Sequence, residues 1–453
     1  MKRLQSAALL ALSLALAGCQ STTRWSEQET IELPSSFQQA DDPQLEIKDS
    51  LLELFANPQL DQVVEAALDN NPDLLRAQAR LEEVGFSLTR AKSSLLPKLS
   101  AGASAIRSEA VGATSSTDTF SAELDASWEV DIWGKVRSSV RASKADLAAA
   151  EADFQAAQQS LVGQTMQAWF ALVAAEKILD LDQRRVTSFE STEKLVSRRF
   201  DLGTATLSEL NLSQTDLQNA RADLESSADA KNRAARRLQT ILGSYPSDQY
   251  EAKLDWPELN ASLAAGIPSQ LLTARPDVAA AYQRVRAADA RVTVTQTELF
   301  PSFRLTANGG RAGPELENLS DSAFNSWSAI ASLAVTLFDA GARRSDIGAA
   351  NKRAEQAYYN YQTVVLNALR EVEDAIGSEY YLAREESARL AALDAARRSL
   401  NRSQRDYETG LISILSLLET QRRVFTTERQ VINLKASRLN NRVSLALALG
   451  KGA

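Results

Sequence analysis

Histidine is absent from this chain of 453 residues, and cysteine occurs once, at Cys19. Without an imidazole, the chain cannot build a histidine acid/base centre, a catalytic triad or a histidine-ligated metal site. A single thiol forms no disulfide within the chain, and no second cysteine is left for catalysis or zinc binding. These absences exclude the commonest catalytic and metal centres.

Glycine and proline are also scarce, at 18 and 11 residues, and the formal net charge is −8. A chain with few helix breakers and much alanine, leucine, glutamine, arginine and glutamate favours long helices. The sequence has no P-loop, no dinucleotide-binding glycine motif and no H-E-x-x-H. Its acidic balance argues against a nucleic-acid-binding protein. We expect a mainly α-helical protein that is not an enzyme and holds no metal or other cofactor.

Most of the sequence consists of two similar halves. Pro72 and Pro97 recur 204 residues later as Pro276 and Pro301. Three later glycines recur after 207 residues, in the pairs Gly134 and Gly341, Gly203 and Gly410, and Gly243 and Gly450. This spacing predicts two structural repeats, residues 58–243 and 268–450, joined by a linker at 244–267. Each repeat would run helix, strand hairpin, very long helix, turn and helix.

The first residues have the layout of a bacterial secretory signal. Lys2 and Arg3 precede an apolar run at 7–17, and Leu16-Ala17-Gly18-Cys19 has the pattern of a lipobox. We therefore predict that residues 1–18 are removed and that Cys19 carries a covalent lipid that includes palmitate. Gln20 follows the cysteine in place of an aspartate, which favours the outer membrane over the inner one. Residues 19–57 would link the lipid to the body of the protein.

Two segments of each half alternate between apolar and polar residues, as strands with two different faces do. In the first half, residues 119–133 alternate almost perfectly and residues 98–107 form the partner strand, which predicts a hairpin at 98–133. The second half repeats this at 302–309 and 325–338, within a hairpin at 301–338. Four acidic residues share the polar side of the first hairpin: Glu123, Asp125, Glu129 and Asp131.

The mature chain has no apolar run near the roughly 20 residues of a membrane-spanning helix, whereas its strands are long enough to span and have an apolar face. An open sheet edge in lipid leaves backbone groups unpaired, at several kcal/mol each, so a spanning sheet must close. Four strands cannot close alone, and several chains would have to share one barrel. A soluble β-sandwich is the alternative.

Segments without proline predict two helices on the order of 100 Å, at 135–202 and 342–407, from a rise of roughly 1.5 Å per residue. Shorter helices are expected at about 58–95, 207–242, 268–299 and 411–449, and two of them placed end to end match one long helix. Thr206 and Glu209 form a capping box. Antiparallel coiled coils of this kind would give four helical columns per chain, which favours a trimer over a dimer.

These features together resemble a known family. The lipobox, Asn71-Pro72-Asp73-Leu74, Leu95-Leu96-Pro97 and Val130-Asp131-Ile132-Trp133-Gly134 occur in order, followed by Arg275-Pro276-Asp277-Val278 and Phe338-Asp339-Ala340-Gly341. The chain resembles the TolC-type outer-membrane efflux channels, in the lipidated branch that includes OprM and the NodT-like outer-membrane factors. The resemblance covers essentially the whole mature chain.

The resemblance implies a homotrimer in the bacterial outer membrane. Its 12-stranded transmembrane β-barrel, with four strands per chain, would continue into a long α-helical barrel in the periplasm. The partners would be a periplasmic adaptor (membrane fusion) protein and an inner-membrane pump of the resistance-nodulation-division type. The channel would be a passive exit duct for drugs and toxic small molecules.

Site residues follow from the same resemblance. The adaptor-docking tips would be Leu202, Gly203, Thr204, Thr409, Gly410 and Leu411. The periplasmic gate would comprise Leu415 and Glu419, with Leu418 and Tyr407 beside them. The family often has aspartate at Glu419 and arginine at Glu408. The alternative is that the leucines are coiled-coil packing residues and Glu419 a solvated charge.

Charge at these positions has a consequence for ions. Three copies of Glu419 facing one axis would repel, which favours protonation or cation binding. The acidic strand face would make the lumen prefer cations if it points inward.

Two other functions remain open from the sequence: an outer-membrane channel for type I protein secretion, and a non-channel coiled-coil structural lipoprotein. With two methionines and no histidine, a dedicated soft-metal relay is not expected.

Overall fold

The computed structural model describes residues 24–28, 37, 55, 57–109, 111, 116–247, 255–257 and 274–451. The predicted signal, Cys19 and most of the two predicted linkers lie outside the described residues. The chain divides into two compact units. The first comprises residues 1–31, 82–150 and 280–363, and the second comprises residues 32–81, 151–279 and 364–453. The long helices α4 (Lys135–Asp201) and α8 (Ala342–Glu408) contribute to both units.

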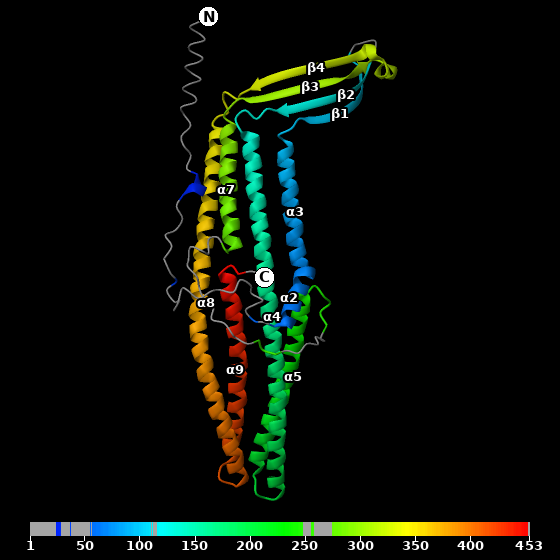
Figure 1. Cartoon of the computed structure of the whole chain (residues 1–453). Coiled ribbons are helices and arrows are strands. Elements are labelled where there is room, and N and C mark those ends of the chain that lie inside the picture. Colours follow the sequence, from blue (N-terminus) through cyan, green and yellow to red (C-terminus); the bar gives the residue numbers. More distant parts are fainter. Residues whose placement is uncertain are drawn as a thin grey trace. The chain divides into compact units, whose positions relative to one another are not determined.

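The first unit contains a four-stranded antiparallel sheet in the order β1-β2-β3-β4. Its strands are β1 (Lys98–Ser108), β2 (Thr117–Glu129), β3 (Ser302–Gly313) and β4 (Asn325–Ala334), which lie side by side in Figure 1. The two hairpins therefore form one continuous sheet. In the described part of the chain, β1 and β4 each pair on one side only.

The register keeps the two faces of the sheet chemically distinct. Leu99, Ala126, Ala307 and Ala329 form one row across the four strands, and Ser100, Asp125, Asn308 and Ser328 form a row on the opposite face. Because side chains alternate between faces, the rows nearest the helices repeat this pattern. Toward the other end of the sheet the apolar face becomes polar, with Arg311 opposite Asn325 and Arg107 opposite Asp118. The larger members of the apolar face are Leu99, Phe120, Leu124, Trp128, Phe303, Leu305, Trp327 and Leu333.

Three strand ends differ from the predicted ones by four residues each. β2 ends at Glu129 where we expected residue 133, β4 ends at Ala334 where we expected 338, and β3 continues to Gly313. Backbone pairing sets these ends: Ser302, the first residue of β3, lies opposite Ala334, and Arg304 lies opposite Glu129. The apolar alternation continues past the point where a partner strand is present, so the pattern alone overestimated both strands.

Two helices come directly before strands in the sequence. α3 (Pro72–Ser93) precedes β1, α7 (Pro276–Thr297) precedes β3, and short 3-10 turns, η3 (Leu316–Leu319) and η4 (Ser322–Phe324), lie between β3 and β4. At the junction of the sheet with the helices, Trp133 stacks on Phe300 at 4.9 Å between ring centroids and donates a 2.8 Å hydrogen bond to the carbonyl of Pro301. None of the helices among the described residues is long and apolar enough to span a membrane.

The second unit is helical. It contains α2 (Pro58–Asn70), α5 (Leu207–Ile241) and α9 (Ile414–Ala448), together with α4 from residue 151 and α8 from residue 364 onward. The single helix expected at 58–95 is wrong, because it breaks at Asn71. Pro72 has no N–H to continue the helix, and the Asn71 side chain instead accepts hydrogen bonds of 3.0 Å from the amides of Asp73 and Leu74. Asn71 thus caps a new helix.

The ends of the short helices are held by glycines. Gly243 and Gly450, 207 residues apart, have φ of 67° and 73°, a conformation that favours glycine. A Cβ on Gly243 would lie 2.3 Å from the carbonyl oxygen of Asn70, and one on Gly450 would lie 2.6 Å from that of Ala274. Each glycine therefore lets one helix end close against the backbone two residues before another helix begins, at Pro72 or Pro276.

Candidate functional site: helix tips and the ion-pair network

The two turns that we predicted to dock a partner have the same backbone structure. Gly203 and Gly410 take φ of 69° and 77°. In the first turn the amide of Thr204 bonds the carbonyl of Arg199 at 2.7 Å, and in the second the amide of Leu411 bonds that of Asp406 at 2.7 Å. These closures satisfy carbonyls at the helix ends, as a Schellman motif does. All six predicted tip residues are exposed, with Leu202 at 78% and Leu411 at 71%.

Helix α9 begins at Ile414, three residues later than predicted, because the turn needs residues 411–413 and Ser413 is the N-cap. The capping box at Thr206 and Glu209 is confirmed. Both tips therefore end in a helix start that is fixed by its own side chain.

Arg199 ties the first tip to the second. Its guanidinium lies 4.8 Å from the centroid of the Tyr407 ring and donates a 3.1 Å hydrogen bond to the Tyr407 carbonyl. Tyr407 is 3% exposed. Burial raises the pKa of its phenol above the ordinary value, so the ring stays neutral near pH 7. A cation over a neutral aromatic ring is a favourable contact.

The four predicted gate residues separate into two groups. Leu418 is fully buried in the core of the helical unit, as is Tyr407, whereas Leu415 is 57% exposed and Glu419 is exposed. Glu419 accepts a 2.6 Å hydrogen bond from Arg423 one turn later, and both side chains are open to solvent. Leu415 and Glu419 are therefore solvent-exposed in the protomer, whereas Leu418 and Tyr407 pack between the helices.

Buried ion pairs that the sequence did not reveal join the helices above the tips. Arg422 on α9 holds Asp216 on α5 with three hydrogen bonds of 2.7–3.1 Å. Arg429 donates two bonds of 2.6 Å to Asp182 of α4, which is 1% exposed and also receives the hydroxyl of Ser227. The partners lie more than 200 residues apart, so no local pattern could have paired them.

Glu428 joins three helices. It accepts hydrogen bonds from Arg184 of α4 at 2.7 Å and from Arg397 of α8 at 2.9 Å. Burial opposes ionisation of Glu428, but the hydrogen bonds and charges of the two arginines outweigh it and lower the pKa of the carboxyl below its ordinary value. Among the described residues, no cluster of His, Cys, Asp and Glu could hold a metal ion.

The acidic strand residues differ in how they are compensated. Glu129 pairs with Lys135 at 3.4 Å. Asp131 is partly buried, which would raise its pKa, but hydrogen bonds from the amides of Arg137 and Val136 and from the Arg137 side chain lower that pKa. Asp131 thereby fixes the start of α4. Glu123 and Asp125 have no ion-pair partner in the part of the chain that the structure describes.

The Glu428 site predicts a pH-dependent loss of stability. Replacing Glu428 by glutamine should lower the stability of the helical unit near pH 7 by about 1.5–3 kcal/mol, the usual contribution of a hydrogen bond to a charged group. Because the folded-state pKa is lowered, this contribution is present above the ordinary glutamate pKa of about 4.3 and is lost as the pH falls through the folded value. The two proteins should therefore converge in acid. Thermal melting in detergent, followed by circular dichroism at pH 7 and at an acid pH below the folded-state pKa of Glu428, measures the difference in stability between the two proteins.

Asp394→Asn is the matched control, because Asp394 pairs with Arg398 on the exposed face of α8. An exposed pair one helical turn apart contributes about 0.3–0.5 kcal/mol. A Glu428→Gln deficit that is equal at both pH values would contradict the assignment.

Comparison with known proteins identifies the family. Residues 63–244 and 267–451 match the model described as outer membrane efflux protein. The cation efflux system protein CusC of Escherichia coli K12 is 25% identical over 448 residues, which cover 97% of this chain and 98% of CusC. The pyoverdine export outer membrane protein OpmQ of Pseudomonas putida is 29% identical over 463 residues, or 98% and 97% of the two chains.

A solved structure of the outer-membrane channel OprN has a TM-score of 0.86 at 25% identity and covers 94% of this chain and 98% of OprN. The mainly helical fold with a small antiparallel sheet is thus shared with known channels. The chain belongs to the outer membrane efflux protein family and is an outer-membrane component of an efflux system.

Proposed function

We propose that three copies of this chain close a 12-stranded barrel and form the exit duct of a tripartite efflux system. One observation carries the proposal: within the described part of the chain, β1 and β4 each leave one edge unpaired, while one face of the sheet is apolar across all four strands, as in the row Leu99, Ala126, Ala307 and Ala329. In lipid, each unpaired backbone group costs several kcal/mol. Pairing β4 of one copy with β1 of the next satisfies both edges and keeps the antiparallel order.

Strand lengths support the same proposal. The four strands have 11, 13, 12 and 10 residues, and about 9–11 residues are needed for a tilted strand to cross a bilayer. A barrel of twelve strands is wide enough to leave a lumen, whereas one of eight is filled by its own side chains. The polar sheet face with Glu123 and Asp125 would line that lumen, and a lipid on Cys19 would anchor each copy.

The duct need not select its cargo. CusC is named for a cation and OpmQ for pyoverdine, so one architecture serves chemically different molecules. In this chain the methionines are Met1 and Met166, and Met166 is fully buried. We infer a passive duct without catalysis, cofactor or metal relay, which passes what its inner-membrane pump delivers.

The lumen charge predicts ion selectivity. Reconstituted channels with the mass of three chains should prefer cations, and Glu123→Gln/Asp125→Asn should shift the reversal potential in a salt gradient toward zero, because six carboxylates leave the lumen. The control is Asp118→Asn, since Asp118 lies in register with Arg107 on the other sheet face. Anion preference, or an equal shift in the control, would argue against the orientation.

We propose that the exposed tips receive the periplasmic adaptor. Their leucines, Leu202 and Leu411, project from turns that are already satisfied by backbone hydrogen bonds, which leaves the side chains free for a partner. Cysteines at these two positions should cross-link to a co-expressed adaptor in intact cells, as detected by mass spectrometry of the conjugate. Ser226→Cys, exposed along α5, should give no conjugate; equal conjugation at all three sites would refute specific docking.

We also propose that Leu415 and Glu419 narrow the periplasmic end. The exposed pair with Arg423 contributes little, so three carboxylates near one axis would still attract cations. Glu419→Ala should increase the current through single channels in planar bilayers and weaken block by divalent cations. Glu408→Ala, which removes an exposed charge just before the second tip, should leave both unchanged. If Glu419→Ala alters neither current nor block, Glu419 is not part of a constriction.

A further inference from the structure

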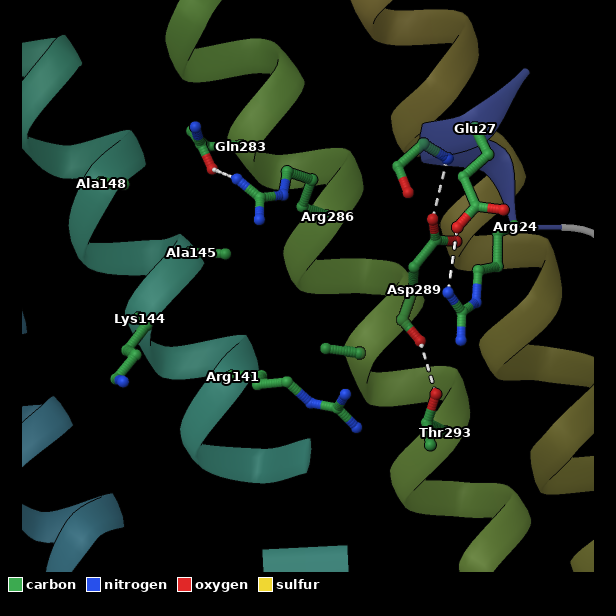
Figure 2. Close-up of a pocket in the computed structure, with 12 residues that line it drawn as sticks. Arg24, Glu27, Arg141, Lys144, Ala145, Ala148, Gln283, Arg286, Asp289 and Thr293 are labelled. Carbon is green, nitrogen blue, oxygen red and sulfur yellow. Dashed lines mark hydrogen bonds and ion pairs between the residues drawn. The ribbon is translucent and has the colours of Figure 1, made fainter. Parts of the chain in front are cut away.

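The first unit contains a cavity of about 410 Å³ that the channel function does not use. It is lined by α4, by α7 and by the short 3-10 turn η1 (Trp25–Glu27). Figure 2 shows Arg141 extending from α4 toward α7, with Lys144 on the same helix and Arg286 on α7. The remaining charged lining residues are Arg24, Glu27 and Asp289.

Within this cavity, positive charge exceeds negative charge. Glu27 is paired with Arg24 at 2.9 Å. Asp289 accepts the backbone amides of Trp25 and Ser26 at 3.2 and 2.8 Å. In the part of the chain that the structure describes, Arg141, Lys144 and Arg286 have no carboxylate within ion-pair distance. Their neutral partners are Ser138 for Arg141 and Gln283 for Arg286.

The turn η1, which lines the cavity, lies only a few residues after the predicted lipid anchor at Cys19. Trp25 packs against Tyr358 and Tyr359 of α8, at 5.4 and 6.2 Å between ring centroids, and Asp289 holds its backbone. Arg24 follows Cys19 by five residues, which span at most about 18 Å when fully extended. A lipid on Cys19, which is part of the proposed function, would therefore keep the bilayer within that reach of the cavity.

The position of the basic residues along α4 gives a second estimate of how far the cavity lies from the membrane. Arg141 and Lys144 lie six and nine residues into α4, or about 9 and 14 Å from its start. The headgroup layer adds roughly 5–7 Å beyond the hydrocarbon on each side. Long arginine and lysine side chains at this depth can reach the phosphates of the nearest leaflet.

We propose that this cavity binds the phosphate of an anionic lipid headgroup from the periplasmic leaflet. Arginine donates two parallel hydrogen bonds to a phosphate, and lysine adds a point charge. Arg141, Lys144 and Arg286, from two helices and without a carboxylate partner among the described residues, provide this chemistry at one site. Basic pockets next to a membrane are suited to such headgroups.

Native mass spectrometry of the purified full-length protein in detergent tests the proposal, with phosphatidylglycerol and phosphatidylcholine as probes. The wild type should retain phosphatidylglycerol in preference. Arg141→Ala/Lys144→Ala/Arg286→Ala should lower its retention by at least roughly tenfold, since each basic residue near a membrane adds a substantial attraction. Arg286→Gln alone should give a smaller loss and serves if the triple variant fails to assemble.

The matched control is Arg90→Ala/Lys92→Ala/Arg344→Ala, which removes three exposed cations from the sheet-side ends of α3 and α8. This variant should retain phosphatidylglycerol like the wild type. Equal loss in both triples, or no loss in either, overturns the site. Inorganic phosphate that saturates the cavity while phosphatidylglycerol is not retained would also overturn it, because the ligand would then be a free anion.

The mass of the mature chain reports separately whether Cys19 is lipidated, and channel conductance reports the proposed duct. Retention of phosphatidylglycerol in detergent requires neither. Failure of the headgroup site can therefore be distinguished from failure of the proposed function.

Discussion

Backbone hydrogen bonding at the two outer strands is the constraint on which the molecule depends. Among the residues that the structure describes, β1 and β4 have a partner strand on one side only, and the sheet between them has an apolar face that includes Leu99 and Ala329. Such a sheet is unstable in water, because its apolar face is exposed, and in lipid, because its edges are open. Lipid would cover the apolar face, and pairing with neighbouring copies, as proposed, would satisfy the open edges.

The two halves share a backbone plan but differ in their side chains. Both tips close with the same hydrogen bonds around Gly203 and Gly410. The residue 207 positions after Arg199 is Asp406, so the second half has a carboxylate where the first half has a guanidinium. The guanidinium of Arg199 contacts the ring of Tyr407. This contact between the two helical hairpins is therefore made by a side chain that the second half does not have at the equivalent position.

Local patterns predicted the elements better than their contacts. Helix ends at Gly203 and Gly243 and the capping box at Thr206 could be predicted because each depends on a few adjacent residues. The helix break at Asn71 was not predicted, although Pro72 follows it directly, because the apolar periodicity continues from one helix into the next. The ion pairs of Asp182, Asp216 and Glu428 could not be predicted, because each joins residues that only the fold brings together.

The carboxylates of this protein serve in two ways, depending on whether an arginine of the same protomer neutralises them. Asp182 is almost fully buried and accepts hydrogen bonds from Arg429, so removing Arg429 would leave a buried carboxylate without its cation, which is costly. Such pairs fix which helices lie together. Glu123 and Asp125 lie on an exposed sheet face beside small neighbours such as Gly102 and Ser100, and no cation of the described chain neutralises them. Charge that is compensated within the protomer stabilises the fold, and only the remaining charge can act on ions from outside.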